Sequence, residues 1–438
     1  MSDAQPTQPT LEALRSLMRS KAARWGASAL TLLGLTLAGP LLGLADGPTH
    51  PPRASTTTVR AQTATAERRA RPRIVQGVNL AERRLEDDAY VVDTARGETA
   101  FLSLDAGLQQ HLEAYFARYE VPEAGLVAMD PTTGRVLAYI NHRGRDTAAA
   151  DMATSSGPPA ASVFKIITGA ALLESGVTAS ERVCYHGGES RLGLGHLEFN
   201  PATDRTCNTL AEAMGGSLNA VFARLADQHL EPADLERYGQ AFAFGQALPF
   251  DLASEPSALE VPTDRLEFAR ASAGFWHSHL SPLHGALIAS TIANGGAMPR
   301  AGVVDRLVDG EGHVTHHFES GTYRQVIGRD TATQLNQMMR LTVSRGTSRR
   351  SFHDDRGRPF LPGILVAGKT GTLSEERPYR GYTWWVGFAP ADHPTIALAT
   401  VVVNTPEWRI KASHAAVETL RYWLVDREAE RARRARAH

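Results

Sequence analysis

The chain contains Ser162-Val163-Phe164-Lys165, followed directly by Ile166-Ile167-Thr168-Gly169-Ala170-Ala171-Leu172-Leu173. The apolar run predicts a buried helix, and the preceding Gly157-Pro158-Pro159 is typical of a loop. Ser162 therefore belongs at a helix N-terminus, with Lys165 one turn along on the same face. A desolvated Lys165 amine could take the serine proton, and backbone N–H groups at the helix start could receive an oxyanion. Taken alone, however, Ser-x-x-Lys more often marks an N-cap serine and a surface lysine.

Lysine is rare in this sequence, which makes each lysine informative. Of the 46 basic residues only four are lysine, at positions 21, 165, 369 and 411, which leaves 42 arginines. A desolvated amine can lose its proton, whereas a guanidinium effectively cannot. The lysines are therefore candidates for work that arginine cannot do. Ser-x-x-Lys occurs once in the chain, at Ser162.

A second motif, Gly368-Lys369-Thr370-Gly371-Thr372, allows two interpretations. Together with Gly363 it spells the Walker A pattern, which requires a flexible phosphate loop followed by a helix. The residues around it contradict that pattern, because an apolar run precedes the motif and another apolar strand follows it. We therefore expect an edge strand whose lysine and threonine side chains hold a substrate carboxylate, with glycines that let the substrate approach closely.

A third motif, Ser217-Leu218-Asn219, precedes a helical run and supplies a polar group between the other two. A competitor of similar shape, Thr206-Cys207-Asn208, lies beside a cysteine and before another helix. Ser-x-Asn alone usually caps a helix. Its value here comes from its order in the chain, after Ser-x-x-Lys and before Lys-Thr-Gly, which form a recorded combination of catalytic signatures.

With these three motifs in order, residues 101–424 resemble the transpeptidase domain of penicillin-binding proteins. The resemblance implies an α+β fold, with an antiparallel sheet flanked by helical layers and an all-helical subdomain. From the residues alone we also expect a helix capped by Asp105 and a hairpin that turns at Asp130-Pro131-Thr132-Thr133-Gly134.

The resemblance also implies the catalytic roles. Ser162 resembles the nucleophile that attacks the D-Ala-D-Ala carbonyl, Lys165 its general base, and Ser217 the group that relays a proton to the departing D-alanine. The backbone N–H groups of Ser162 and Thr372 would form the oxyanion hole. No metal or organic cofactor is implied.

The substrate-binding residues follow from the same resemblance. Asn219 would hold the stem-peptide amide, and Lys369, Thr370, Gly371 and Thr372 would form the strand that binds the terminal carboxylate. His277, His279 and His284 match no metal-binding pattern, and we expect them to be solvated or packed.

The N-terminal part predicts a membrane anchor. The run Gly26–Ala45 has twenty residues without a charge, which is enough to cross a hydrocarbon core of about 30 Å. Basic residues on its N-terminal side place residues 1–25 in the cytoplasm and the remainder outside. A cleaved signal peptide is the alternative. We expect a linker over 46–100, a transpeptidase domain over 101–426, and an Arg-rich tail over 427–438.

The charge and composition of the chain limit the kinds of partner it can have. With 46 basic and 47 acidic residues the net charge is −1, which lacks the basic footprint of a nucleic-acid binder. Hydrophobic residues make up 42% of the chain, as in a globular protein. Cys184 and Cys207 could pair in an oxidising compartment or remain two buried thiols.

The sequence therefore predicts a single-pass protein of the bacterial inner membrane that cross-links peptidoglycan stem peptides and binds β-lactam antibiotics. A cell-wall polymerase is the expected kind of partner. Two alternatives remain open at this stage. One is hydrolysis by the same acyl-enzyme, as in D,D-carboxypeptidases or class D-like serine β-lactamases. The other is a non-catalytic sensor or scaffold that binds penicillin or peptidoglycan.

Overall fold

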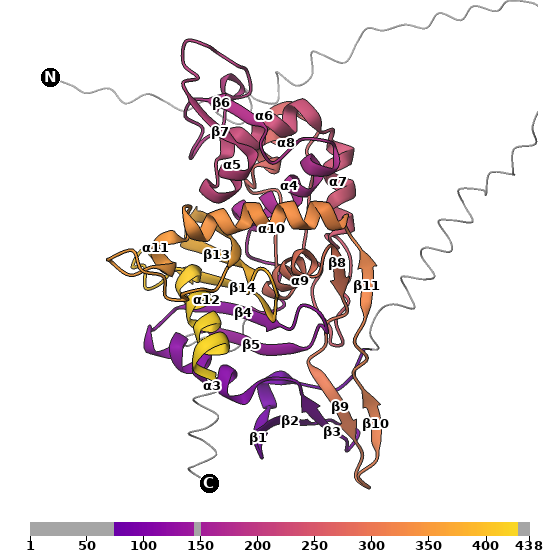
Figure 1. Ribbon diagram of the computed structural model, residues 1–438. Helices are drawn as coiled ribbons and strands as arrows, with labels where there is room; N and C mark the ends of the chain where they lie inside the picture. Colours follow the sequence, from indigo (N-terminus) through magenta and orange to yellow (C-terminus); the bar gives the residue numbers. More distant parts are fainter. Residues whose placement is uncertain (1–73, 144–149, 428–438) are drawn as a thin grey trace, which may run out of the picture. The chain divides into compact units, whose positions relative to one another are not determined.

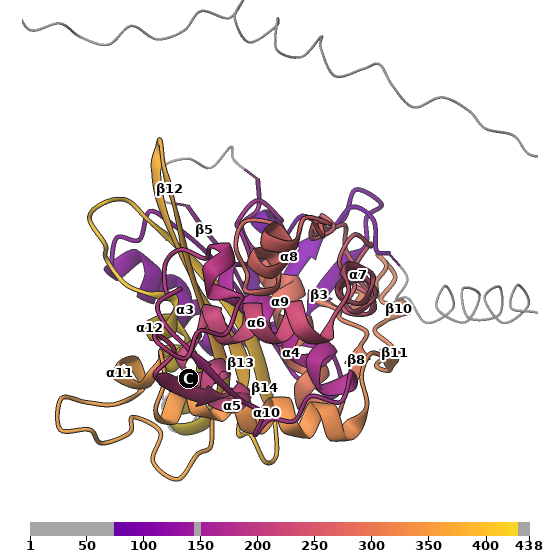
Figure 2. The same cartoon turned by 90° about the horizontal axis from the view of Figure 1, so that it is seen from above.

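A five-stranded antiparallel sheet forms the centre of the computed structural model, which describes residues 74–143 and 150–427. Its strand order is β12-β13-β14-β4-β5, so β5, labelled in Figure 1, and β12, labelled in Figure 2, form its two edges. The strands are β12 (Ala367–Glu376), β13 (Tyr379–Ala389), β14 (Ile396–Asn404), β4 (Glu123–Met129) and β5 (Val136–Arg143).

The central sheet is buried on both faces, which explains its long apolar strands. Alternate residues of each strand enter two different cores. Val386 of β13 packs on the side of α9 (Pro282–Ala293), whereas Trp385 packs on the side of α3 (Ala106–Arg118) and α12 (Ala412–Arg421). The α3 helix has the predicted cap at Asp105, and β4 and β5 form the predicted hairpin.

A group of helices lies beside the sheet and surrounds α4 (Lys165–Glu174), as Figures 1 and 2 show. Nine residues of α4, Lys165 to Leu173, are buried, as the apolar run predicted. The surrounding helices are α5 (Leu210–Gly216), α6 (Asn219–His229), α7 (Pro232–Ala241), α8 (Arg265–Ser272) and α10 (Arg329–Ser344). Above them a hairpin pairs β6 (Arg182–Tyr185) with β7 (Thr206–Thr209).

A second five-stranded sheet corrects the predicted linker. Its strands are β1 (Arg84–Glu86), β2 (Ala89–Asp93), β3 (Thr99–Leu102), β9 (Val304–Val308) and β10 (Val314–His317). The linker prediction over 46–100 is therefore wrong for residues 84–100. The strands are short, and β3 pairs with β9 about 200 residues later, so no local periodicity reveals them.

The remaining described elements are short. They are the 3₁₀ turns at Leu80–Glu82, Ala161–Phe164 and Leu194–His196, the pair β8 (Ala297–Pro299) and β11 (Thr322–Gln325), α11 (Arg349–Phe352) and a π-helical turn at Tyr422–Asp426. No helix within 74–143 or 150–427 is long and apolar enough to cross a membrane. The predicted anchor over 26–45, residues 1–25, residues 46–73 and tail residues 428–438 all lie outside the described residues.

The buried side chain of Gln109 closes part of the β5 edge. Its amide nitrogen donates to the carbonyl oxygen of Tyr139 at 2.9 Å, and its amide oxygen accepts from the Tyr139 backbone N–H at 2.9 Å. The glutamine thus replaces a neighbouring strand at that position, which satisfies two backbone groups that would otherwise be buried without partners.

Replacing this glutamine tests the edge arrangement. Gln109→Leu should lower the free energy of unfolding by roughly 2 to 4 kcal/mol, because both Tyr139 backbone groups lose their partners. Urea unfolding followed by circular dichroism measures this change. Gln240→Leu alters an exposed helical glutamine and should shift stability by less than about 0.5 kcal/mol. Equal effects from the two variants would contradict the role given to Gln109.

Candidate active site

Ser162 lies where the sequence placed it, in the 3₁₀ turn Ala161–Phe164 that leads into α4. Its hydroxyl oxygen is 2.8 Å from the Lys165 ammonium nitrogen. The preceding Ala161 has a φ of 51°, a left-handed conformation that costs an alanine about 1 to 3 kcal/mol. The folded structure thus holds Ser162 directly after a strained residue, partly exposed and in contact with a buried lysine.

Lys165 is fully buried and makes three hydrogen bonds. Besides contacting Ser162, its Nζ donates to Asn219 Oδ1 at 2.7 Å and to the Ala273 carbonyl oxygen at 2.6 Å. Desolvation by burial lowers the pKa of Lys165 well below its ordinary value, and the nearby Lys369 lowers it further. The site therefore favours a neutral amine next to the serine hydroxyl.

Lys369 is the second fully buried amine of the site. It lies on the edge strand β12, as predicted, and its Nζ donates to Ser217 Oγ at 2.9 Å and to the Thr370 carbonyl oxygen at 2.8 Å. Burial lowers the pKa of Lys369 to about 7. Its charge can therefore respond to an anion that enters the cleft.

Ser217 and Asn219 join the two lysines from a third segment. Ser217 ends α5 in the left-handed conformation, with a φ of 58°, and Asn219 begins α6. This tight connection directs the Ser217 hydroxyl to Lys369 and the Asn219 amide to Lys165. The competing motif lies elsewhere, on β7, where Asn208 accepts a hydrogen bond from the Tyr185 hydroxyl.

The strand β12 approaches the serine turn very closely. A Cβ atom at Gly371 would lie 3.1 Å from the Ala160 carbonyl oxygen, so only glycine fits without a shift. The indole N–H of Trp384 on the neighbouring strand donates to the Pro159 carbonyl oxygen at 2.8 Å, which fixes the same approach. Thr372 is exposed on β12, next to this approach.

Sequence reasoning missed several groups that complete the site. The Ala273 carbonyl oxygen accepts a hydrogen bond from Lys165, and the Glu189 carbonyl oxygen accepts one from Asn219. A side-chain motif does not predict a backbone acceptor. Thr347, which follows α10, shares a hydrogen bond with the Thr370 hydroxyl. The sequence did not predict this contact, because it depends on the packing of α10 against β12.

The two cysteines and the three histidines that the sequence singled out contact other groups than the motif side chains. Cys184 and Cys207 are joined by a disulfide that bridges the β6–β7 hairpin, with Cα atoms 3.9 Å apart. His284 is fully buried against the Phe242 carbonyl oxygen, and burial lowers its pKa to about 4. The other two histidines that the sequence singled out contact different groups: His277 contacts Glu267, and His279 contacts the Gly157 carbonyl oxygen.

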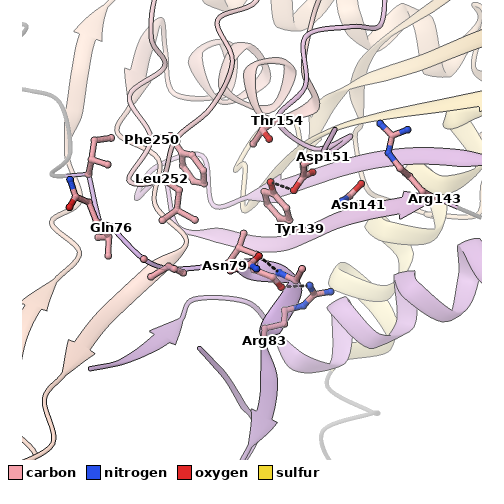
Figure 3. Close-up of a pocket in the computed structure, with 17 residues that line it drawn as sticks. Gln76, Asn79, Arg83, Tyr139, Asn141, Arg143, Asp151, Thr154, Phe250 and Leu252 are labelled. Atoms are coloured by element: carbon pink, nitrogen blue, oxygen red, sulfur yellow. Dashed lines mark hydrogen bonds between the residues drawn. The ribbon is translucent and has the colours of Figure 1, made fainter. Parts of the chain in front are cut away.

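A cavity of about 780 Å³ lies away from the cleft, next to the opposite edge strand of the central sheet. Tyr139 and Asn141 of β5 line it together with residues of the segment before β1, among them Asn79 and Arg83 (Figure 3). The Tyr139 hydroxyl is hydrogen-bonded to Asp151 there. None of the motif residues lines this cavity, so the chemistry belongs to the cleft and not to this hollow.

The fold and the Ser162–Lys165–Ser217–Lys369 arrangement define a serine acyl-transfer type of site. Residues 124–421 match the family model of the penicillin binding protein transpeptidase domain. The chain belongs to this family.

The relatives extend this finding. The chain is 26% identical over 333 residues to peptidoglycan D,D-transpeptidase PbpA of Mycobacterium tuberculosis, which covers 67% of this chain and 64% of that protein. It is 25% identical over 316 residues to stage V sporulation protein D of Bacillus subtilis, which covers 68% of this chain and 48% of that protein. The chain thus spans between about half and two thirds of these relatives.

Solved structures support the fold. The D,D-transpeptidase domain of a peptidoglycan glycosyltransferase from Eggerthella lenta has a TM-score of 0.63 at 24% identity, covering 75% of this chain and 83% of that chain. An imipenem acyl-enzyme complex of penicillin-binding protein A from M. tuberculosis has a TM-score of 0.63 at 24% identity, covering 74% of this chain and 79% of that chain.

The burial of Lys369 predicts a pH dependence of stability. Its pKa is about 7 in the folded protein against an ordinary 10.5, so the unfolded state binds more protons between these values. Stability should therefore rise with pH, and this residue should contribute about 2 kcal/mol of the rise between about pH 7 and pH 9. Lys369→Met should remove that contribution.

Urea unfolding of both proteins at the two pH values measures the difference. Lys411→Met changes an exposed lysine and should retain the full rise seen in the wild type. If Lys369→Met showed the same rise as the wild type, the amine would not be buried in the way described.

Proposed function

We propose that this protein is a peptidoglycan D,D-transpeptidase that forms an acyl-serine intermediate at Ser162 and also reacts there with β-lactams. The observation that carries the proposal is the contact of Ser162 Oγ with a buried lysine amine, 2.8 Å away. Membership of the penicillin binding protein transpeptidase family supports it, as does the name of the relative from M. tuberculosis.

The surroundings of Lys165 favour its role as general base. The Ala273 carbonyl oxygen and Asn219 Oδ1 can only accept hydrogen bonds. A neutral amine has two N–H groups and one lone pair. When the two N–H groups donate to these oxygens, the lone pair is left to accept the proton of Ser162.

Acylation then follows from the positions of the residues. Ser162 Oγ bonds to the carbonyl carbon of the penultimate D-alanine and transfers its proton to Lys165. Backbone N–H groups of Ser162 and Thr372 stabilise the oxyanion. When the C–N bond breaks, the proton held by Lys165 is relayed through Ser217 to the leaving D-alanine amine, which restores the neutral lysine and yields the ester and free D-alanine.

Substrate binding uses the edge strand. The terminal carboxylate would meet the Lys369 ammonium and the hydroxyls of Thr370 and Thr372, while Asn219 would hold the stem-peptide amide. An approaching carboxylate favours the charged form of Lys369 and so raises the pKa of this lysine from about 7. Binding of the carboxylate thereby stabilises the ammonium form of Lys369, and this ammonium group holds the substrate.

The site favours transfer to an amine over hydrolysis. Within the part of the chain that the structure describes, the hydrogen-bond partners of Lys165 and Lys369 are hydroxyls, an amide and backbone carbonyls, with no carboxylate among them. A carboxylate that activates water at the ester, which a hydrolase could use, is therefore not among these groups.

We further propose an extracytoplasmic location, with the run 26–45 as a single-pass anchor in the bacterial inner membrane. The disulfide between Cys184 and Cys207 supports an oxidising compartment. A cell-wall polymerase would be the partner that supplies glycan strands carrying stem peptides, because a transpeptidase needs such strands as substrate.

Labelling tests the nucleophile and its base. Ser162→Ala should abolish covalent labelling by a fluorescent penicillin. Lys165→Arg should slow labelling by at least about 100-fold, because a guanidinium keeps the charge but cannot accept the proton. Gel fluorescence gives the labelling rate, and circular dichroism verifies that both variants fold. Persistent labelling of folded Ser162→Ala would rule out the assignment.

The lifetime of the adduct distinguishes a transpeptidase from a β-lactamase. The penicilloyl ester on Ser162 should persist for minutes to hours after free drug is removed, which corresponds to a barrier of at least about 20 kcal/mol. Intact-protein mass spectrometry against time measures this lifetime. Rapid turnover of penicillin with no accumulated adduct would instead identify a β-lactamase.

A further inference from the structure

A loop over residues 186–205, which we call the covering loop, connects β6 to β7 beside the first turn of α6. The disulfide Cys184–Cys207 joins its two ends. Gly188 lies against α6 so closely that a Cβ atom there would be 3.0 Å from the Ala220 side chain. The loop therefore touches the helix that begins with Asn219.

A buried arginine of α6 binds this loop at several points, and Arg270 of α8 adds a contact to the Leu192 carbonyl oxygen at 2.6 Å. Arg224 is 1% exposed, and its Nε donates to the His196 carbonyl oxygen at 2.7 Å. Its Nη atoms donate to the carbonyl oxygens of Cys184 and Glu198 and to the Asp204 carboxylate. A fork of N–H groups thus binds the loop at its start, middle and end.

The charge of Arg224 is compensated within the same contact. Its Nη1 lies 2.7 Å from Asp204 Oδ2, and the Asp204 side chain is fully buried. Although desolvation acts in the opposite direction, the hydrogen bonds from Arg224 and neighbouring groups lower the pKa of Asp204. The pair is therefore ionised, and removing either partner leaves a buried charge without its counterion.

The covering loop reaches the catalytic centre through one backbone atom. Asn219 Nδ2 donates to the Glu189 carbonyl oxygen, while Asn219 Oδ1 accepts from Lys165. An amide has one donor end and one acceptor end, so the first contact fixes the direction of the second. If the loop moved away, the amide could rotate and present its NH₂ group to Lys165. The lone pair of neutral Lys165 would then accept a hydrogen bond from Asn219 and would not be available for the proton of Ser162.

We propose that Arg224 is a positioning residue for acylation, because it holds the Glu189 carbonyl oxygen where it fixes the orientation of the Asn219 amide. This inference rests on the proposed function of Ser162 and Lys165. The effect passes through the backbone of the covering loop, and the exposed Glu189 side chain takes no part in it.

Arg224→Gln tests the proposal. The second-order rate constant for labelling by a fluorescent penicillin should fall about tenfold, the factor that corresponds to the net loss of one hydrogen bond. The rising limb of its pH profile should also move to lower pH, because a donor facing Lys165 disfavours the ammonium form. Loss of the Arg224 charge alone would move the limb the other way. Lys369, from β12, is the charged group that acts on Lys165, and it is unchanged in the variant.

Three further variants separate positioning from general destabilisation. Gly188→Val displaces the covering loop without removing a buried charge and should reproduce both effects even if Arg224→Gln folds poorly. Ser190→Ala changes an exposed residue of the covering loop and should react at the wild-type rate. In the Asn219→Asp background, where both side-chain oxygens accept, Arg224→Gln should have less than about a threefold further effect.

The outcomes are distinguishable from failure of the proposed function. Absence of labelling in the wild type would contradict the proposed function itself. Normal labelling of the wild type, together with a wild-type rate and an unmoved pH limb in folded Arg224→Gln or Gly188→Val, would overturn only the positioning role. An equal tenfold loss in the Asn219→Asp background would also overturn it, because the amide orientation would then not transmit the effect.

Discussion

The burial of two lysine amines in one cleft is the constraint on which the site depends. Lys165 and Lys369 are both fully buried, and burial lowers the pKa of each amine because the ammonium form loses its contact with water. In the proposed mechanism one amine is neutral so that it can accept a proton, whereas the other carries a charge when a carboxylate binds. The surroundings separate these tasks: Lys165 contacts Asn219 and the Ala273 carbonyl oxygen, while Lys369 lies on the edge strand β12.

Such a cleft can form only if three segments far apart in the chain are held within hydrogen-bond distance. The fold achieves this by close backbone approach. Gly371 lets β12 touch the serine turn, Trp384 ties the sheet to the residue before that turn, and Ala161 accepts a strained conformation. The stability of the two cores on either side of the sheet offsets these local costs.

The motifs could be found in the sequence because their side chains carry distinctive chemistry. Ser162 and Lys165 were predictable from helix spacing, and Lys369 from an apolar run ending in Lys-Thr-Gly. Strands β1 to β3 could not be found in the same way, since each is only three to five residues long and the sheet is completed by β9, which pairs with β3 from about 200 residues later. The same limit applies within the site: Ala273 and Glu189 contribute backbone oxygens, and any residue type supplies those.

Side-chain groups and backbone acceptors of the site should tolerate amino-acid substitution differently. A side chain such as Lys165 is fixed by its chemistry, but a backbone acceptor is fixed by whatever holds the loop that carries it. For Glu189 the groups that hold the loop are Arg224, Asp204, Arg270 and the disulfide, all outside the motifs. Substitutions along the exposed part of the covering loop should therefore be neutral while its carbonyl oxygens stay in place. In the proposed mechanism, the residues that affect acylation from outside the cleft are those that bind the loop, because they decide where its backbone lies.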